Sequence, residues 1–257
     1  MADLQGNEPL EKALADLSVH PKVLVALDFD GTLAPLQDDP ENSRMLPESR
    51  EVVDALTDID GVHLSLVTGR AFENIMRVAD PHPDWFLVGS HGIEVVAPHE
   101  RDSYATPQLV PDGLLQGFHK IAQDIPGPRI EVKPFGLAIH TRGLEADVAA
   151  AAEAATRLLC DEWPDELVMR SGHGILECAV SGRTKGDGLR SLWEALDVHA
   201  TLFIGDDVTD EDGFAVLGSG DLGIKVGAGA TKASHRVADP HEVTRVLWNL
   251  HERLTSR

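Results

Sequence analysis

The chain has 257 residues, of which 42% are hydrophobic and 25% charged, enough for one large domain or for a domain that carries an insert. Asp and Glu number 43 against 22 Lys and Arg, which gives a formal net charge of −21. This charge repels nucleic-acid phosphates and anionic lipid surfaces, and it argues against both as partners. The chain has no run of 18 apolar residues, so the sequence predicts no membrane-spanning helix. The acidic first twenty residues do not resemble a secretory signal. We therefore expect a cytoplasmic protein.

Short apolar runs alternate with amphipathic stretches along the chain, a pattern typical of an α/β fold with a parallel sheet. Each apolar run is continuous rather than alternating, as in strands that are covered on both faces. The predicted strands of this sheet are 22–29, 62–69, 85–90, 200–207 and 222–227, and the predicted helices are 48–59, 71–79, 184–197, 208–217 and 240–255.

The interval from 105 to 180 has a different pattern, in which strand pairs joined by short Gly-containing turns indicate antiparallel hairpins. We therefore predict a Rossmann-like parallel-sheet hydrolase core made of 1–104 and 181–257, interrupted by an α+β domain at 105–180. The elements predicted in this insert are helices at 112–124 and 144–161 and strands at 129–135, 136–142, 167–171 and 174–180.

Alternation along the strands of the insert predicts two unlike faces of its sheet. One face is apolar and would be covered by helices, whereas the other is polar. The polar face is either solvated or a lid for a hydroxylated ligand. The charged side chains predicted on it are Lys133, His140, Arg142 and Glu177.

The chain has two cysteines, Cys160 and Cys178. Both lie in apolar stretches, and their spacing matches no metal-binding motif. We expect them to be small buried side chains with free thiols, in a reducing compartment.

Two acidic motifs follow predicted core strands directly. The first, Asp28-Phe29-Asp30-Gly31-Thr32, places two carboxylates at the carboxyl edge of the sheet, where α/β proteins bind ligands. The second, Gly205 to Glu211, reads GDDVTDE and brings further acids to a strand end. Acids so close repel one another unless a cation or a shared proton intervenes, although an Asp-rich turn or helix start also tolerates them. A hard divalent cation such as Mg²⁺ resolves the repulsion and suits a site that also holds phosphate.

Two further segments are compatible with phosphate binding. Thr68-Gly69-Arg70 offers a hydroxyl and main-chain N–H groups at a helix start, and Lys185 begins another predicted helix. Taken alone, each has an ordinary explanation, because Thr-Gly often ends a strand and a lone lysine is usually solvated. The GxGxxG pattern at 218–223 follows a helix and precedes a strand, the reverse of a dinucleotide-binding site, so we exclude that function.

The order DxDGT, TGR, lysine, GDDxTDE resembles the phosphohydrolases of the haloacid dehalogenase superfamily, and 105–180 lies where their C2-type caps are inserted. The resemblance implies that Asp28 is the nucleophile, which forms an aspartyl-phosphate, and that Asp30 is the general acid and base. It implies Mg²⁺ as the cofactor. The implied ligands are the Asp28 carboxylate, the Asp30 carbonyl and Asp206, supported by Asp207 and Asp210, and the implied phosphate-binding residues are Thr68, Gly69 and Lys185.

A finer similarity is to the trehalose-6-phosphate phosphatase family. It rests on LDFDGTLAPL (27–36), LVTGR (66–70), GSHGIE (89–94), EVKPFGLAIHTR (131–142), ILECAVSGRTKGDGL (175–189) and FIGDDVTDEDGF (203–214). It implies hydrolysis of trehalose 6-phosphate, a small-molecule substrate, and a functional link to a trehalose-6-phosphate synthase. The residues that it implies in substrate binding are Arg70, His91, Glu94, Glu131, Lys133, His140, Arg142 and Glu177.

Three alternatives remain open. The first is another sugar phosphatase of the superfamily, acting on sucrose 6-phosphate or mannosyl-3-phosphoglycerate. The second is a phospho-accepting receiver module, but receivers have no acid two residues after the phosphorylated aspartate and no inserted cap. The third is a catalytically silent regulatory domain, which the presence of Asp28, Asp30, Lys185 and Asp206 disfavours.

Overall fold

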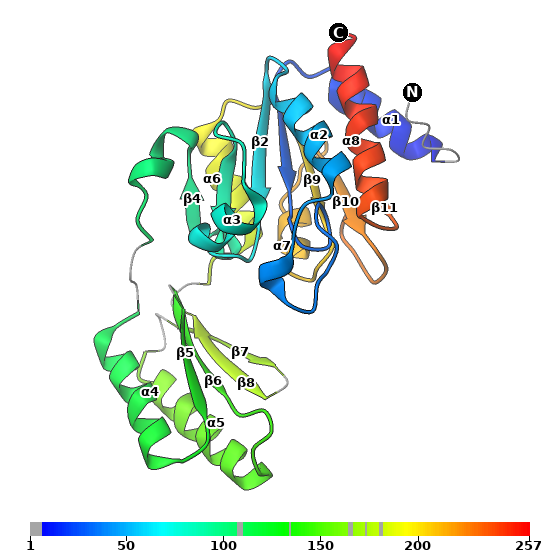
Figure 1. Ribbon diagram of the computed structural model, residues 1–257. Helices are drawn as coiled ribbons and strands as arrows, with labels where there is room; N and C mark the ends of the chain where they lie inside the picture. Colours follow the sequence, from blue (N-terminus) through cyan, green and yellow to red (C-terminus); the bar gives the residue numbers. More distant parts are fainter. Residues whose placement is uncertain (1–6, 107–109, 134, 164–166, 173, 180–181) are drawn as a thin grey trace. The chain divides into compact units, whose positions relative to one another are not determined.

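The chain divides into two compact units in a computed structural model (Figure 1). The core unit is Met1–Tyr104 with Arg183–Arg257, and the insert unit is Ala105–Gly182. The predicted boundary at 180–181 lies outside the residues that the structure describes. The described residues are 7–106, 110–133, 135–163, 167–172, 174–179 and 182–257.

The core unit is built on a seven-stranded sheet of order β11-β10-β9-β1-β2-β3-β4. All neighbouring strands are parallel except β4, which runs antiparallel to β3. The five predicted strands form, each somewhat shorter than predicted, and β4 and β11 are additional because strands of three residues carry no periodicity. The strands are β1 (Val23–Leu27), β2 (Val62–Val67), β3 (Phe86–Gly89), β4 (Glu94–Val96), β9 (Ala200–Gly205), β10 (Leu222–Val226) and β11 (His235–Val237).

Helices cover both faces of this sheet, which explains why its strands are apolar throughout. Along β1, Val23, Val25 and Leu27 pack with α1, α2, α3 and α8, whereas Leu24 and Ala26 pack with α6 and α7. Helix α1 was not predicted. The helices are α1 (Glu8–Ser18), α2 (Pro47–Thr57), α3 (Phe72–Ala79), α6 (Lys185–Ala195), α7 (Asp210–Phe214) and α8 (Pro240–Thr255), with 3₁₀ turns η1 (Pro40–Asn42), η2 (Ser90–Gly92) and η3 (Pro98–Ser103).

The insert unit has a four-stranded antiparallel sheet of order β5-β6-β8-β7. The predicted apolar face is confirmed, because Leu137, Ile139 and Leu176 pack against Leu114 and Phe118 of a covering helix. All six predicted elements form. They are α4 (Asp112–Asp124), β5 (Arg129–Lys133), β6 (Gly136–His140), α5 (Ala146–Cys160), β7 (Val168–Gly172) and β8 (Ile175–Ala179).

The prediction of two free thiols is wrong, because Cys160 and Cys178 are joined by a disulfide. The predicted burial is correct, since the two residues are 2% and 0% exposed. Cys160 ends α5 and Cys178 lies in β8, so the two meet only where the helix packs on the sheet. Their separation of 18 residues in the sequence did not reveal this contact.

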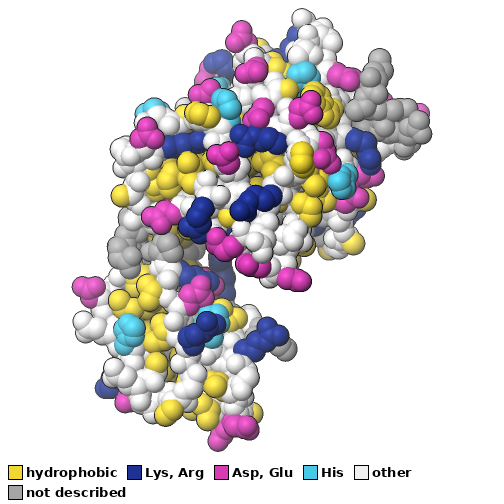
Figure 2. All heavy atoms as spheres, viewed as in Figure 1, with side chains coloured by type: hydrophobic (Ala, Val, Ile, Leu, Met, Phe, Trp, Pro, Cys, Tyr) yellow, Lys and Arg dark blue, Asp and Glu magenta, His cyan; other side chains and the backbone are white. Residues whose placement is uncertain are grey.

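The charge of the chain is spread rather than gathered on the face shown in Figure 2. There, Asp and Glu side chains are scattered among Lys, Arg and hydrophobic side chains. The net charge of −21 is therefore a property of the whole chain and not of one patch on this face. Within the described parts of the chain, no helix has the length and apolar character needed to cross a membrane.

Candidate active site

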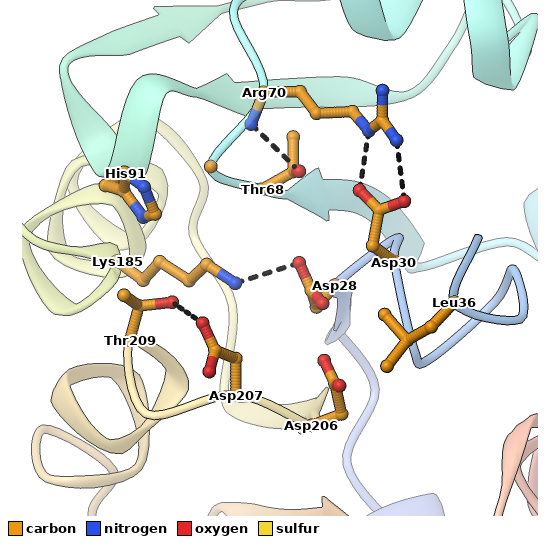
Figure 3. A pocket seen from close by; sticks show the side chains of 11 residues that line it. Asp28, Asp30, Leu36, Thr68, Arg70, His91, Lys185, Asp206, Asp207 and Thr209 are labelled. Atoms are coloured by element: carbon orange, nitrogen blue, oxygen red, sulfur yellow. Dashed lines mark hydrogen bonds and ion pairs between the residues drawn. The ribbon is translucent and has the colours of Figure 1, made fainter. Parts of the chain in front are cut away.

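The core motifs meet at the carboxyl ends of β1, β2 and β9. Strand β1 lies between β2 and β9, so the order of the strands along the sheet reverses direction at β1. Ligands of open α/β sheets bind in the crevice outside such a reversal. A pocket of about 330 Å³ lies there (Figure 3). Its lining is Asp28, Asp30, Leu36, Thr68, Gly69, Arg70, His91, Lys185, Asp206, Asp207 and Thr209.

The turn after β1 holds both of its aspartates on the pocket. Phe29 is fully buried in the core cluster, whereas Asp28 and Asp30 on either side of it line the pocket. Gly31 follows with a φ of +75°, a left-handed conformation that favours glycine. A Cβ at Gly31 would lie 2.1 Å from Oδ2 of Asp206, so the glycine also makes room for the second acidic motif.

One buried ammonium joins two carboxylates that are distant in the sequence, Asp28 directly after β1 and Asp210 at the start of α7. Nζ of Lys185 donates to Oδ1 of Asp28 at 2.8 Å and to Oδ1 of Asp210 at 2.7 Å. Burial raises the pKa of Asp28 well above its usual range, although Lys185 opposes that shift. Burial acts to lower the pKa of Lys185, but the charges of Asp28 and Asp210 outweigh it and raise that pKa. Lys185 is therefore held charged beside the predicted nucleophile.

The acid cluster fits a divalent cation. One oxygen each of Asp28, Asp206 and Asp210 lies within 4.8 Å of the others. Asp210 is fully buried, and its second oxygen accepts the main-chain N–H of Asp207 at 2.9 Å, so its carboxylate is already bonded to the protein through both oxygens. Burial, and then the charge of Asp210, raise the pKa of Asp206. Asp210 is therefore less available to a cation than Asp206 is, and the ligand roles predicted for these residues stay predictions.

Asp30 is bound by a guanidinium rather than by the lysine. Arg70 donates to its two oxygens at 2.5 and 2.7 Å (Figure 3). The buried Ser43 hydroxyl also donates to Asp30, at 2.6 Å. The remaining Arg70 nitrogen donates to Asn74 at 2.6 Å, and one also reaches the carbonyl of Pro40 at 2.8 Å. All three nitrogens of Arg70 are therefore bonded to protein, and the substrate-binding role predicted for it stays a prediction.

Thr68 and Gly69 form one wall of the pocket together with the loop after β3. Thr68 is buried, and its Oγ1 accepts the main-chain N–H of Arg70 at 3.2 Å. The imidazole of His91 lies against Gly69, where a Cβ would be 2.5 Å from Cε1. Ser90 and His91 both have left-handed backbones, with φ of 49° and 56°, a strained arrangement that is concentrated at functional sites. Main-chain hydrogen bonds from Ser90 to Arg70 and from His91 to Thr68 hold the two segments together.

Glu94 lies beneath this wall and does not line the pocket. It is 1% exposed. Its Oε2 accepts from the main-chain N–H of Phe72, in the first turn of α3, and from the hydroxyl of Ser90, at 2.9 and 2.7 Å. Its Oε1 accepts from the hydroxyl of Tyr104 at 3.3 Å. The structure thus places Glu94 as an anchor of the wall.

Replacing Glu94 by alanine is therefore expected to destabilise the core unit. The donors Phe72 N–H and Ser90 Oγ would lose their acceptor, which lowers the free energy of unfolding by about 2 kcal/mol or more. Urea unfolding of the purified chain measures the loss. Tyr104→Phe, which removes only one long hydrogen bond, is the control and should cost less than about 1 kcal/mol. Unchanged unfolding with a raised KM would instead make Glu94 a substrate contact.

The predicted polar face of the insert sheet carries an ion pair and a contact between a histidine and a carboxylate. Lys133 pairs with Glu177 at 2.9 Å, and His140 contacts Glu131 at 2.8 Å. Arg142 differs from the prediction, because β6 ends at His140 and Arg142 is exposed in the turn that follows. The face thus offers alternating carboxylates and cationic groups to a polar ligand.

Leu36 lines the pocket and was not predicted as a site residue, and neither were three polar residues at the site. Ser43 binds Asp30, Thr209 lines the pocket beside Asp207, and Lys225 donates to the main chain of the second acidic motif. The lone charge of Lys225 within an apolar strand was a usable signal. Ser43 had none, because it lies in an irregular segment after η1.

A mostly parallel sheet with an aspartate-rich pocket at its carboxyl edge and an antiparallel insert before the motif lysine gives the chain the same fold as a sugar phosphatase of the haloacid dehalogenase superfamily. The profile of the trehalose-phosphatase family matches residues 26–243. The chain belongs to that family.

Individual relatives agree with this assignment. Trehalose-6-phosphate phosphatase of Escherichia coli is 29% identical over 238 residues, which cover 89% of this chain and 85% of that protein. Trehalose-6-phosphate phosphatase of Aspergillus fumigatus matches with a TM-score of 0.75 at 22% identity, covering 95% of this chain and 97% of that one. A sugar phosphatase of haloacid dehalogenase subclass IIB matches with a TM-score of 0.54 at 15% identity, over 86% and 95% of the two chains. Both structural matches show a shared fold.

Proposed function

We propose that this chain hydrolyses trehalose 6-phosphate to trehalose and inorganic phosphate with Mg²⁺ as cofactor. The observation that carries the proposal is Lys185, whose ammonium holds the buried Asp28 and Asp210 carboxylates at 2.8 and 2.7 Å, beside a pocket that Lys185, Asp28 and Asp206 line. A carboxylate nucleophile, a fixed cation and a place for a divalent cation are the parts that phosphoryl transfer requires. Membership of the trehalose-phosphatase family supports the choice of substrate.

The reaction would proceed in two displacements at phosphorus. An oxygen of Asp28 attacks, the bond from phosphorus to the sugar oxygen breaks, and Asp30 gives a proton to that oxygen. Asp30 then takes a proton from water, whose oxygen attacks the aspartyl-phosphate and releases phosphate with the Asp28 carboxylate restored. Asp30 must break its two hydrogen bonds with Arg70 to deliver its proton. We therefore propose that Arg70 and Ser43 hold Asp30 in position between turnovers.

The charge of the phosphoryl group would be balanced by groups already in place. Thr68, the N–H groups after it and Lys185 bind the phosphoryl oxygens. Asp28, Asp206 and the carbonyl of Asp30 would hold Mg²⁺, with Asp207 and Asp210 in support. The cation would neutralise charge on the transferring oxygens.

The sugar would be bound by groups that alternate in charge. His91 lines the pocket of the core unit, and the polar sheet face of the insert unit carries Glu131, Lys133, His140 and Glu177, with Arg142 in the following turn. On this sheet face, carboxylates accept and cationic side chains donate, so the face of the insert unit suits the hydroxyls of a sugar. The insert unit is therefore proposed to determine substrate choice.

Phosphate release from a panel of sugar phosphates tests the proposal. We expect trehalose 6-phosphate to be preferred over sucrose 6-phosphate, mannosyl-3-phosphoglycerate and glucose 6-phosphate, and we expect EDTA to abolish release until Mg²⁺ is restored. Glu177→Gln should raise the KM for trehalose 6-phosphate while p-nitrophenyl phosphate, which has no sugar, is hydrolysed as by the unaltered chain. Lys120→Met, at an exposed position on α4, is the matched control.

Preference for another sugar phosphate would keep the core chemistry and overturn the assigned substrate. No release from any member of the panel would favour the silent or the signalling alternative.

A further inference from the structure

Lys225 is a buried lysine that the proposed chemistry does not use. It lies in β10, a strand whose other members are Leu222, Gly223, Ile224 and Val226, and it is 4% exposed. The strand register pairs it with Gly205, the residue before Asp206. A buried ammonium is costly unless acceptors surround it, so its contacts show what it does.

The ammonium binds the main chain of the second acidic motif. Nζ of Lys225 donates to the carbonyl oxygen of Asp206 and, at 3.1 Å, to that of Asp207. Oε1 of Glu211 is 3.9 Å away, beyond hydrogen-bond distance. Lys185, in contrast, binds carboxylate oxygens. The two buried lysines therefore hold different parts of the same acid cluster.

We propose that Lys225 is a positioning residue that sets the affinity of the site for its divalent cation, an inference that rests on the metal site of the proposed function. Lys225 holds two consecutive carbonyl groups in place, and this fixes the direction in which the Asp206 side chain points from the backbone. At its other end, the Asp206 carboxylate packs against Gly31, where it occupies the space that a Cβ would need. Asp206 is thus restrained at its backbone and at its carboxylate.

The ammonium also offsets the charge of the loop without occupying the carboxylates that the cation needs. Groups that orient metal ligands in this way typically change metal affinity or activity by about 10- to 100-fold when they are lost. A lysine that only satisfied buried carbonyls would change the stability of the fold and leave the affinity for the cation unaltered.

Calorimetric titration of the full chain with Mg²⁺, without substrate, tests this role. Lys225→Met keeps the apolar stem and removes the donors, and it should bind Mg²⁺ about 10- to 100-fold more weakly than the unaltered chain. Lys22→Met is the matched control. Lys22 directly precedes β1 and pairs with Asp197 at 2.9 Å, so its loss should leave Mg²⁺ binding unchanged.

A folded Lys225→Met chain that binds Mg²⁺ as tightly as the unaltered chain would overturn the proposal. If circular dichroism shows that the Met variant does not fold, Lys225→Gln replaces it, because its amide keeps one donor at the strand. That variant should also bind Mg²⁺ more weakly, and unchanged affinity would again refute the role. Failure of the unaltered chain to bind Mg²⁺ would refute the metal site itself, a result distinct from equal binding by the variants.

Discussion

Asp28→Asn is expected to abolish phosphate release, with kcat lowered by on the order of 10⁴-fold or more, because an amide cannot form the acyl-phosphate bond. Asp28 is 3% exposed and bonded to Lys185, so no neighbouring carboxylate can take its place at that position without moving the lysine. Steady-state release of phosphate from trehalose 6-phosphate measures the loss.

The substitution should spare the fold, which makes the result interpretable. Asparagine has nearly the shape of aspartate, and burial raises the pKa of Asp28, so the charge that is removed is one that the folded chain holds at a cost. Asp16→Asn, at an exposed pair with Lys12, is the control for the loss of one negative charge. Residual turnover near that of the control would eliminate Asp28 as the nucleophile and leave the aspartyl-phosphate without support.

The core of the site could be predicted because its signals are local. An apolar strand that ends in Asp28 or Asp206 places a carboxylate at a strand end, and the parallel arrangement brings such ends to one edge of the sheet. The same holds for the strands of the insert unit, whose alternation correctly indicated which face packs against helices. Features of the site that depend on residues adjacent in the sequence can therefore be predicted from the sequence.

What could not be predicted depends on contacts between distant segments. Arg70 reaches Asp30 from another strand end, Glu94 accepts from Phe72 of α3, and Cys160 meets Cys178 only through the packing of α5 on β8. From short motifs, Arg70 and Glu94 were both predicted to bind substrate, because a sequence does not show which side chains are already hydrogen-bonded to the protein.

Lys185→Met is expected to destabilise the chain by about 3–5 kcal/mol, since breaking a buried ion pair removes the cation that stabilises the buried carboxylates. Lys185 is 2% exposed, and both of its partners are buried. Chemical denaturation measures the change. Lys12→Met, at a pair that is mostly exposed to solvent, is the control and should cost no more than about 1 kcal/mol.

A second substitution separates charge from packing in this effect. Adding Asp210→Asn to Lys185→Met removes one of the two carboxylates that have lost their lysine. The double variant should therefore lose less free energy of unfolding than the sum of the losses in the two single variants. Mg²⁺ should restore part of the stability of Lys185→Met, because it supplies positive charge beside Asp28. Strict additivity of the two substitutions would contradict the coupling of Lys185 with Asp210 that the hydrogen bond at 2.7 Å indicates.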